Sequence, residues 1–143
     1  MDISNSFRST NIIVVILLWL SCVPQYAFSQ AAAKDPVIKF AGIDTRVIKT
    51  RTYEQVLASP AFECSDGYKV NRFKISFLNT EENNFYGPYT VNGPKVTGEP
   101  MEVLQKLSNI KATPLKITLD GIRVVAPDTT MRVVAGKVFN IVD

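Results

Sequence analysis

The chain has 143 residues, a formal net charge of +3 at pH 7 and no histidine. This length is sufficient for one domain with a self-sufficient hydrophobic core, and no second domain is required. The small net charge and the lack of a dense Lys/Arg run argue against a nucleic-acid partner, and without histidine there is no imidazole base and no histidine metal ligand.

The first 29 residues have the pattern of an export signal. Arg8 provides a positively charged start, and residues 12–20 form an unbroken apolar run. Small residues at Ala27 and Ser29 suit cleavage by a signal peptidase. We therefore predict a signal peptide over residues 1–29 that is cleaved after Ser29, with delivery to the periplasm or the cell exterior.

Two alternative interpretations of these first residues are a membrane anchor and a lipid-attachment site. A membrane anchor needs about 20 apolar residues, and this run is too short to cross a bilayer. Lipid attachment at Cys22 is the second, because the preceding apolar run resembles a lipobox, although Trp19 stands where such boxes usually carry Leu. Cleavage after Ser29 is preferred to both, and the cleaved protein is not expected to be integral to a membrane.

The sequence lacks the residue combinations of common catalytic and metal sites. Cleavage leaves Cys64 as the only cysteine, which excludes an internal disulfide. We interpret Cys64 as a half-buried apolar side chain in preference to a reactive thiol. The carboxylates Asp66, Glu81 and Glu82 could form a pair for glycoside cleavage or for calcium binding, but they lack ligand spacing and are interpreted as solvated loop charges. We therefore predict no enzyme, no cofactor and no metal site.

The folded domain is expected to span residues 36–143, after an Ala-rich flexible leader over residues 30–35. Segments rich in β-branched residues predict short edge strands at 37–40 and 43–48. Three cations in this part of the chain could form an anion site, although a solvated sheet edge is the preferred interpretation. They are Arg46, Lys49 and Arg51.

Two short helices are predicted from their first residues. Thr52 and Gln55 fit a capping box, in which each side chain bonds the other residue's backbone amide, and Pro60 ends the helix soon afterwards. Glu99 and Pro100 open the second helix, because proline suits the first turn and an acidic side chain complements the positive end of the helix dipole. The apolar stripe that follows would pack on a sheet.

The clearest strand covers residues 68–78. Phe73, Ile75 and Phe77 alternate with polar residues, which is the pattern of an antiparallel strand buried on one face. We expect this strand to be central in its sheet.

The last third of the chain also predicts strands. Residues 115–119 alternate between apolar and polar, Gly121 is expected to introduce a bulge, and return strands should follow at 131–134 and 137–142. With two short helices and no regular strand–helix alternation, the predicted fold class is mainly β. We expect an antiparallel β-sandwich-like single domain.

Residues 79–98 carry many turn residues and are expected to form a long connection. Phe85, Tyr86 and Tyr89 lie within it. Long polar loops that retain aromatic side chains often form binding surfaces, because tyrosine brings apolar area and a polar tip. Two interpretations are open, a binding patch and a lid that folds back on the core, and the lid is preferred.

Taken in order, these features resemble those of a known domain. The motifs are Asp35-Pro36-Val37, Phe73-Lys74-Ile75-Ser76-Phe77, Leu115-Lys116-Ile117, Gly121-Ile122, Pro127-Asp128 and Phe139-Asn140-Ile141. Their order and spacing resemble the C-terminal periplasmic domain of GldM, a gliding-motility and type IX secretion protein of Bacteroidetes. The segment after Gly42 is poorer in glycine than in that family.

The resemblance implies a non-catalytic β-rich envelope protein that binds other proteins, among them outer-membrane ring components of the secretion motor. It would be an accessory of type IX secretion or gliding motility. A cleavable signal stands where GldM-like proteins carry a membrane helix and further domains, so transmission of motor force is not expected. A second hypothesis is an exported carbohydrate- or ligand-binding β-sandwich that uses Phe85, Tyr86 and Tyr89 against a sugar.

Overall fold

A computed structural model of the chain describes residues 35–46 and 50–142. The predicted signal peptide, Cys22, Lys49 and all but the last residue of the predicted leader lie outside the described residues. The elements within them are, in chain order, β1 (Ile38–Phe40), β2 (Ile43–Asp44), β3 (Thr50–Arg51), α2 (Tyr53–Ala58), β4 (Phe62–Cys64), β5 (Lys69–Asn79), β6 (Asn84–Asn92), α3 (Glu99–Asn109), β7 (Leu115–Val125), β8 (Met131–Val134) and β9 (Lys137–Ile141).

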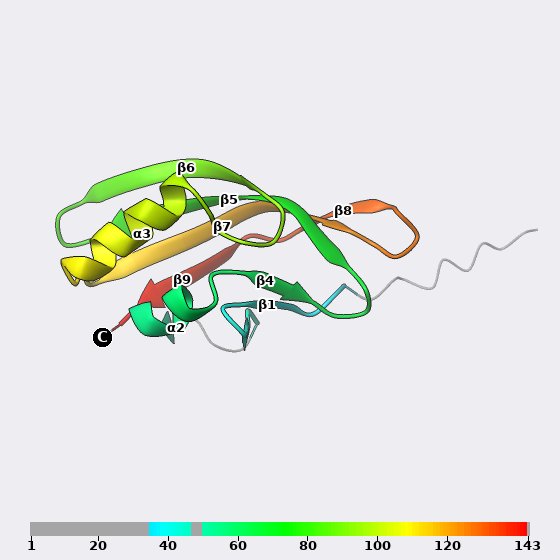
Figure 1. Cartoon of the computed structure of the whole chain (residues 1–143), viewed down its shortest axis with the longest axis horizontal. Helices are drawn as coiled ribbons and strands as arrows, with labels where there is room; N and C mark the ends of the chain where they lie inside the picture. The colour runs from blue at the N-terminus through cyan, green and yellow to red at the C-terminus, as the bar shows by residue number, and fades with distance from the viewer. Residues whose placement is uncertain (1–34, 47–49, 143) are drawn as a thin grey trace, which may run out of the picture. The chain divides into compact units, whose positions relative to one another are not determined.

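The larger of two sheets is built around β5 and β7, two antiparallel strands of eleven residues each. Its strand order is β3-β9-β7-β5-β6, and β8 also pairs with β7. One edge of β7 pairs with β5. The other edge pairs first with β9 and then, further along β7, with β8. Among the strand pairs that the structure describes, β3 with β9 is the one parallel pair. Figure 1 shows β5, β6 and β7 running side by side.

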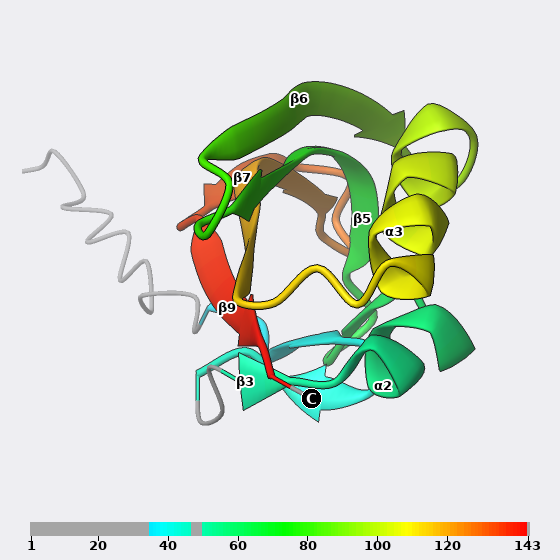
Figure 2. The same cartoon turned by 90° about the vertical axis from the view of Figure 1, so that its left-hand side faces the viewer.

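The smaller sheet and both helices pack on one face of the larger sheet. The smaller sheet has the order β2-β1-β4. The ring of Phe62 lies 4.8 Å from that of Phe73, and the ring of Phe40 lies 5.8 Å from that of Phe139. Leu104 of α3 belongs to the same hydrophobic core, and Figure 2 shows α3 beside α2. The predicted fold class, an antiparallel β-sandwich-like domain with two short helices, is confirmed.

Both predicted helices are present, and the first is capped as expected. The Gln55 amide donates a hydrogen bond to the Thr52 hydroxyl at 3.2 Å, and the Thr52 amide donates one to the Gln55 side chain at 3.0 Å. α3 carries Pro100 in its first turn. The Tyr53 hydroxyl of α2 donates to the Ala112 carbonyl at 2.6 Å, which ties α2 to the segment after α3.

The predicted bulge at Gly121 is also confirmed. The register between β5 and β7 shifts between Arg72 and Lys74, and Gly121 lies in the matching part of β7. Gly121 adopts a φ of 55°, in the left-handed region that favours glycine. The bulge lets both long strands keep their apolar residues on the core side along their whole length.

The prediction of a long connection over residues 79–98 is wrong. Asn84–Asn92 forms β6, an edge strand that pairs with β5 along nearly its whole length. The turn residues Gly87 and Pro88 form an irregularity within this strand, opposite the segment between Ile75 and Phe77. A Cβ on Gly87 would lie only 2.9 Å from the Ile75 carbonyl oxygen, so the strand needs glycine there.

Candidate functional site: the open face of the larger sheet

The larger sheet has two unlike faces, because residues along a strand alternate in direction. On the core side, Phe73, Ile75 and Phe77 of β5 are at most 1% exposed. The residues between them point to the other side, where side chains are mostly exposed. We call this side the open face and define it by its charged and exposed apolar residues, which are Arg72, Lys74, Phe85, Lys116, Asp120, Arg123, Met131, Val133 and Val138.

The open face carries four exposed cations and one exposed acid. Arg72 lies directly opposite Arg123, and Lys74 lies opposite Asp120. The Asp120 carboxylate accepts a hydrogen bond from the Gly121 amide at 2.7 Å. None of these side chains has a salt-bridge partner within 4.0 Å among the residues that the structure describes. The face is therefore positively charged.

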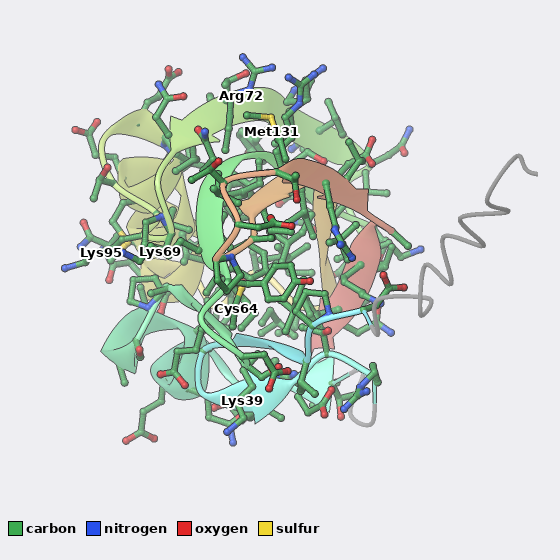
Figure 3. The ribbon with its side chains drawn as sticks, turned by 90° about the vertical axis from the view of Figure 1, so that its right-hand side faces the viewer. Lys39, Cys64, Lys69, Arg72, Lys95 and Met131 are labelled. Atoms are coloured by element: carbon green, nitrogen blue, oxygen red, sulfur yellow. The ribbon has the colours of Figure 1, made fainter. Side chains whose placement is uncertain are left out.

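Arg72 and Arg123 form a like-charged pair across neighbouring strands. Asn92 lies on the far side of Arg72, and Val133 lies on the far side of Arg123, so the four residues form one row across β6, β5, β7 and β8. Like charges in directly opposite positions destabilise a sheet. Figure 3 shows Arg72 and Met131 on the same side of the molecule, with Lys39 on the opposite side. The structure therefore concentrates positive charge at this end of the sheet.

Exposed apolar side chains collect on the same face. Six large apolar residues are exposed among those described, and four of them belong to the open face. These four, with their exposed fractions, are Phe85 at 59%, Met131 at 54%, Val133 at 72% and Val138 at 46%. The register spreads them along the face: Val133 lies opposite Arg123 and Val138 opposite Thr118, whereas Phe85 lies on β6 opposite Leu78. Exposed apolar side chains among charged ones are available to contact another molecule.

The three aromatic residues predicted from the sequence do not share one surface. Tyr86 lies opposite Phe77 and Tyr89 opposite Ile75, so both tyrosines are on the core side, half-buried against the hydrophobic core. Burial, followed by the charge of Glu99, raises the pKa of Tyr89. Phe85 points to the open face. The tyrosines thus take the lid position, and their role in binding stays a prediction.

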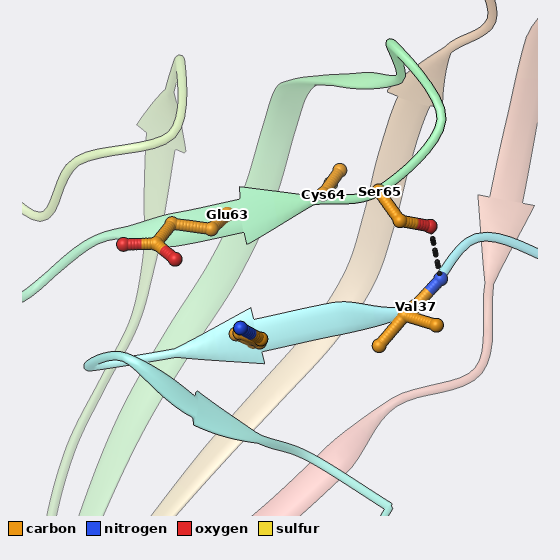
Figure 4. A pocket seen from close by; sticks show the side chains of 5 residues that line it. Val37, Glu63, Cys64 and Ser65 are labelled. Atoms are coloured by element: carbon orange, nitrogen blue, oxygen red, sulfur yellow. Dashed lines mark hydrogen bonds between the residues drawn. The ribbon is translucent and has the colours of Figure 1, made fainter.

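Cys64 lines a small pocket at the end of β4. The pocket has a volume of about 130 Å³ and is also lined by Val37, Lys39, Glu63 and Ser65. Figure 4 shows the hydrogen bond from the Val37 amide to the Ser65 hydroxyl, 3.0 Å long, that joins its two sides. Burial raises the pKa of the Cys64 thiol, which disfavours the reactive thiolate. The half-buried position expected for Cys64 is confirmed.

An open groove of about 660 Å³ lies beside β9. Arg46, Lys116 and Lys137 contribute three cations to its lining. The Arg46 guanidinium is bonded to the Asp44 carboxylate, with Nη2 to Oδ2 at 2.8 Å and Nε to Oδ1 at 3.2 Å. These bonds lower the pKa of Asp44 to about 2. The Arg46 guanidinium is therefore already hydrogen-bonded to Asp44, which makes it less available to bind an added anion.

Arg51 does not belong to that exposed group. It is only 1% exposed, and its guanidinium carbon lies 4.7 Å from the centre of the Phe139 ring. Burial lowers the pKa of Arg51. Of the three cations considered together from the sequence, Arg46 is on the surface, Arg51 is in the core and Lys49 lies outside the described residues. For Arg51, both interpretations are therefore wrong: it belongs neither to an exposed anion site nor to a solvated sheet edge, because its side chain is buried against Phe139.

The shifted carboxylates have local structural explanations. The Asp128 carboxylate accepts hydrogen bonds from the Thr130 hydroxyl at 2.6 Å and the Thr130 amide at 3.0 Å, which lower the pKa of Asp128 and fix the turn before β8.

In the described part of the chain, no three His, Cys, Asp or Glu side chains are grouped to hold a metal ion. No helix in residues 35–46 or 50–142 has the length and apolar character needed to cross a membrane.

Comparison with known proteins adds no assignment. No protein-family model matches the chain, and no curated protein matches it. The relation to GldM therefore rests on the order of sequence motifs and stays a prediction. The geometry of the open face is the main guide to function.

Proposed function

We propose that this chain is a non-catalytic protein-interaction module of the cell envelope and that it binds its partner through the open face. The observation that carries the proposal is that four of the six exposed large apolar side chains among the described residues lie on this one side of the larger sheet, together with four exposed cations. Exposing such side chains together to water is unfavourable, and a partner that covers them would recover this free energy.

An open strand edge beside this face supports the same proposal. β8 pairs with β7 along one edge and has no strand on its other edge among the described residues. Met131 and Val133 of this strand are both exposed. An extended segment of a partner can add to such an edge through main-chain hydrogen bonds. The partner would then contact both the edge of β8 and the open face.

The sequence supports the proposed location and partners. The export signal over residues 1–29 supports the periplasm or the cell exterior. The order of motifs supports a relation to the GldM C-terminal domain and, with it, an accessory role in type IX secretion or gliding motility. The partners on this proposal are envelope proteins, with outer-membrane ring components of the secretion motor as the first candidates.

A crosslinked pull-down from the native cell envelope tests the proposal. The bait proteins are the tagged wild type, Val133→Lys on the open face, and Ile110→Lys as a matched control. Ile110 is 58% exposed and lies just after α3. We expect the wild type and Ile110→Lys to capture the same proteins and Val133→Lys to lose most of them. Equal capture by all three would contradict binding through the open face.

The identity of the captured proteins tests the family relation separately. Enrichment of outer-membrane ring lipoproteins or other secretion-motor components would support the relation to GldM. If the captured proteins are unrelated envelope proteins and their capture still depends on Val133, the result would support an interaction module and contradict a role in type IX secretion.

One observation favours the second candidate function, binding of an exported carbohydrate. Phe85 is 59% exposed on the open face, and an exposed aromatic ring can stack on a sugar. A glycan array with wild type and Phe85→Ala tests this. Retention of a glycan by the wild type and its loss in Phe85→Ala, with protein capture unchanged, would favour the carbohydrate function.

A further inference from the structure

We infer that the open face recognises an acidic protein segment whose carboxylates are seated over Arg72 and Arg123. This inference rests on the proposed function and specifies the chemistry of the partner. Both arginines are exposed, and they lie directly opposite each other on β5 and β7. Because both strands are fixed by the core on their other face, the backbone positions of the two arginines stay opposite each other, and both side chains start from the same place on the open face.

A carboxylate between the two arginines would relieve their repulsion. Like charges at opposite positions destabilise an antiparallel pair, so the free protein carries a cost that an anionic partner removes. The planar guanidinium forms paired hydrogen bonds with a carboxylate, which gives direction as well as attraction. Lys74 follows Arg72 by two positions on the same face and extends the positive charge along β5.

The distribution of acids strengthens this conclusion. Asp120 is the one acid of the open face, and its carboxylate already accepts the Gly121 amide at 2.7 Å. Other acids lie on elements of the covered side, such as Glu54 on α2 and Glu99 and Glu102 on α3. With four cations and one acid, the open face alone carries a net charge equal to the +3 of the whole chain. A surface of this kind steers an acidic partner to itself and repels basic ones.

The apolar neighbours of the arginines favour a protein over another polyanion. Val133 lies directly opposite Arg123 and is 72% exposed, and Met131 in the same strand is 54% exposed. A nucleic acid would use the charges and leave these aliphatic side chains without matching contacts. A membrane surface could not add main-chain hydrogen bonds to the open edge of β8, as a peptide can. An extended segment in which acidic and apolar residues alternate would satisfy both, because its side chains alternate as those of β8 do.

Binding of designed peptides tests the inference directly. The probes are a short fluorescein-labelled peptide in which Glu alternates with Val and the same peptide with Gln in place of Glu. We expect the full mature protein to bind the Glu peptide about tenfold or more tightly than the Gln peptide at low salt. The difference should shrink as ionic strength rises, because the charges are exposed.

Variants connect this binding to the two arginines. Arg72→Glu/Arg123→Glu should lower affinity for the Glu peptide about tenfold or more, and Arg72→Lys/Arg123→Lys should retain part of it. Lys95→Glu/Lys106→Glu is the matched control, since it makes the same change of net charge at two exposed cations outside the open face. Thermal unfolding of each variant checks that the fold is unchanged.

Three outcomes overturn the inference. They are equal binding of the two peptides, binding of neither, and tighter binding to anionic phosphatidylglycerol vesicles than to the Glu peptide. The envelope pull-down separates these from failure of the proposed function. If Val133→Lys removes the captured proteins and Arg72→Glu/Arg123→Glu does not, the open face binds proteins without recognising acids. If neither variant changes capture, both proposals fail.

Discussion

The two faces of the larger sheet are made by the same strands and have opposite properties. On the core side, Phe73 and Phe77 of β5 are fully buried. On the open face, Arg72 and Lys74 from the same strand are exposed. One strand therefore provides stability with every second residue and leaves the others available to a partner.

The largest contrast is expected between residues of β5 that point to opposite faces of the sheet. Phe77→Ala should lower the free energy of unfolding by about 3–5 kcal/mol, because it removes a fully buried ring. Lys74→Ala on the open face should change it by no more than about 0.5 kcal/mol. Urea unfolding of both variants and the wild type measures the difference. Similar losses in the two variants would show that the open face is also needed for stability.

The next largest effect is expected at the irregularity in β6. Gly87 has a φ of 104°, and a Cβ there would lie 2.9 Å from the Ile75 carbonyl oxygen. Gly87→Ala should therefore cost about 2 kcal/mol or more. Gly93→Ala is the control, because Gly93 has a φ of 85° and open space around its Cβ position. A Gly87→Ala loss no greater than that of Gly93→Ala in urea unfolding would contradict the tight approach of β6 to β5.

A smaller effect separates the two sides of β6. Tyr89 is half-buried, with its ring centre 6.4 Å from that of Phe77, and Phe85 is exposed on the open face. Tyr89→Ala should lower stability by about 1–2 kcal/mol, and Phe85→Ala by no more than about 0.5 kcal/mol. If Phe85→Ala is the more destabilising in thermal unfolding, the assignment of the two residues to opposite faces is wrong.

The smallest expected effect lies outside both faces, at the exposed pair of Asp44 and Arg46. Hydrogen bonds from Arg46 lower the pKa of Asp44 from 3.8 to about 2. Because the folded pKa is depressed, the pair stabilises the fold above about pH 4 and loses this effect as the pH falls through about 2. A carboxyl NMR titration should show the low pKa in the wild type and a value near 3.8 in Arg46→Ala. Equal values in the two proteins would contradict the pairing.

Much of the covered side could be predicted from local sequence. The alternation of Phe73, Ile75 and Phe77 identified a central strand because burial on one face imposes a period of two. The capping box at Thr52 and Gln55 was identified because its hydrogen bonds join residues only three positions apart. These features arise from interactions between residues that are close together in the chain, so a single sequence is enough to predict them.

Two features could not be predicted, for different physical reasons. The turn residues Gly87 and Pro88 predict a loop where β6 lies, yet an edge strand can accommodate such residues in an irregularity that the sequence does not reveal. The pairing of Arg72 with Arg123 depends on the register of strands about fifty residues apart in the chain, which is set by bulges and core packing. The composition of the open face therefore depends on strand pairing, which local sequence patterns do not determine.

Site-specific photo-crosslinking in the native envelope tests most directly whether the open face is the binding surface. A photoreactive phenylalanine derivative replaces Val133 on the open face in one protein and Ile110 after α3 in the other, two apolar positions of similar exposure. We predict a discrete crosslinked partner at Val133 and none at Ile110. Crosslinks of equal yield at both positions, or a partner captured only at Ile110, would contradict the assignment of the open face as the binding surface.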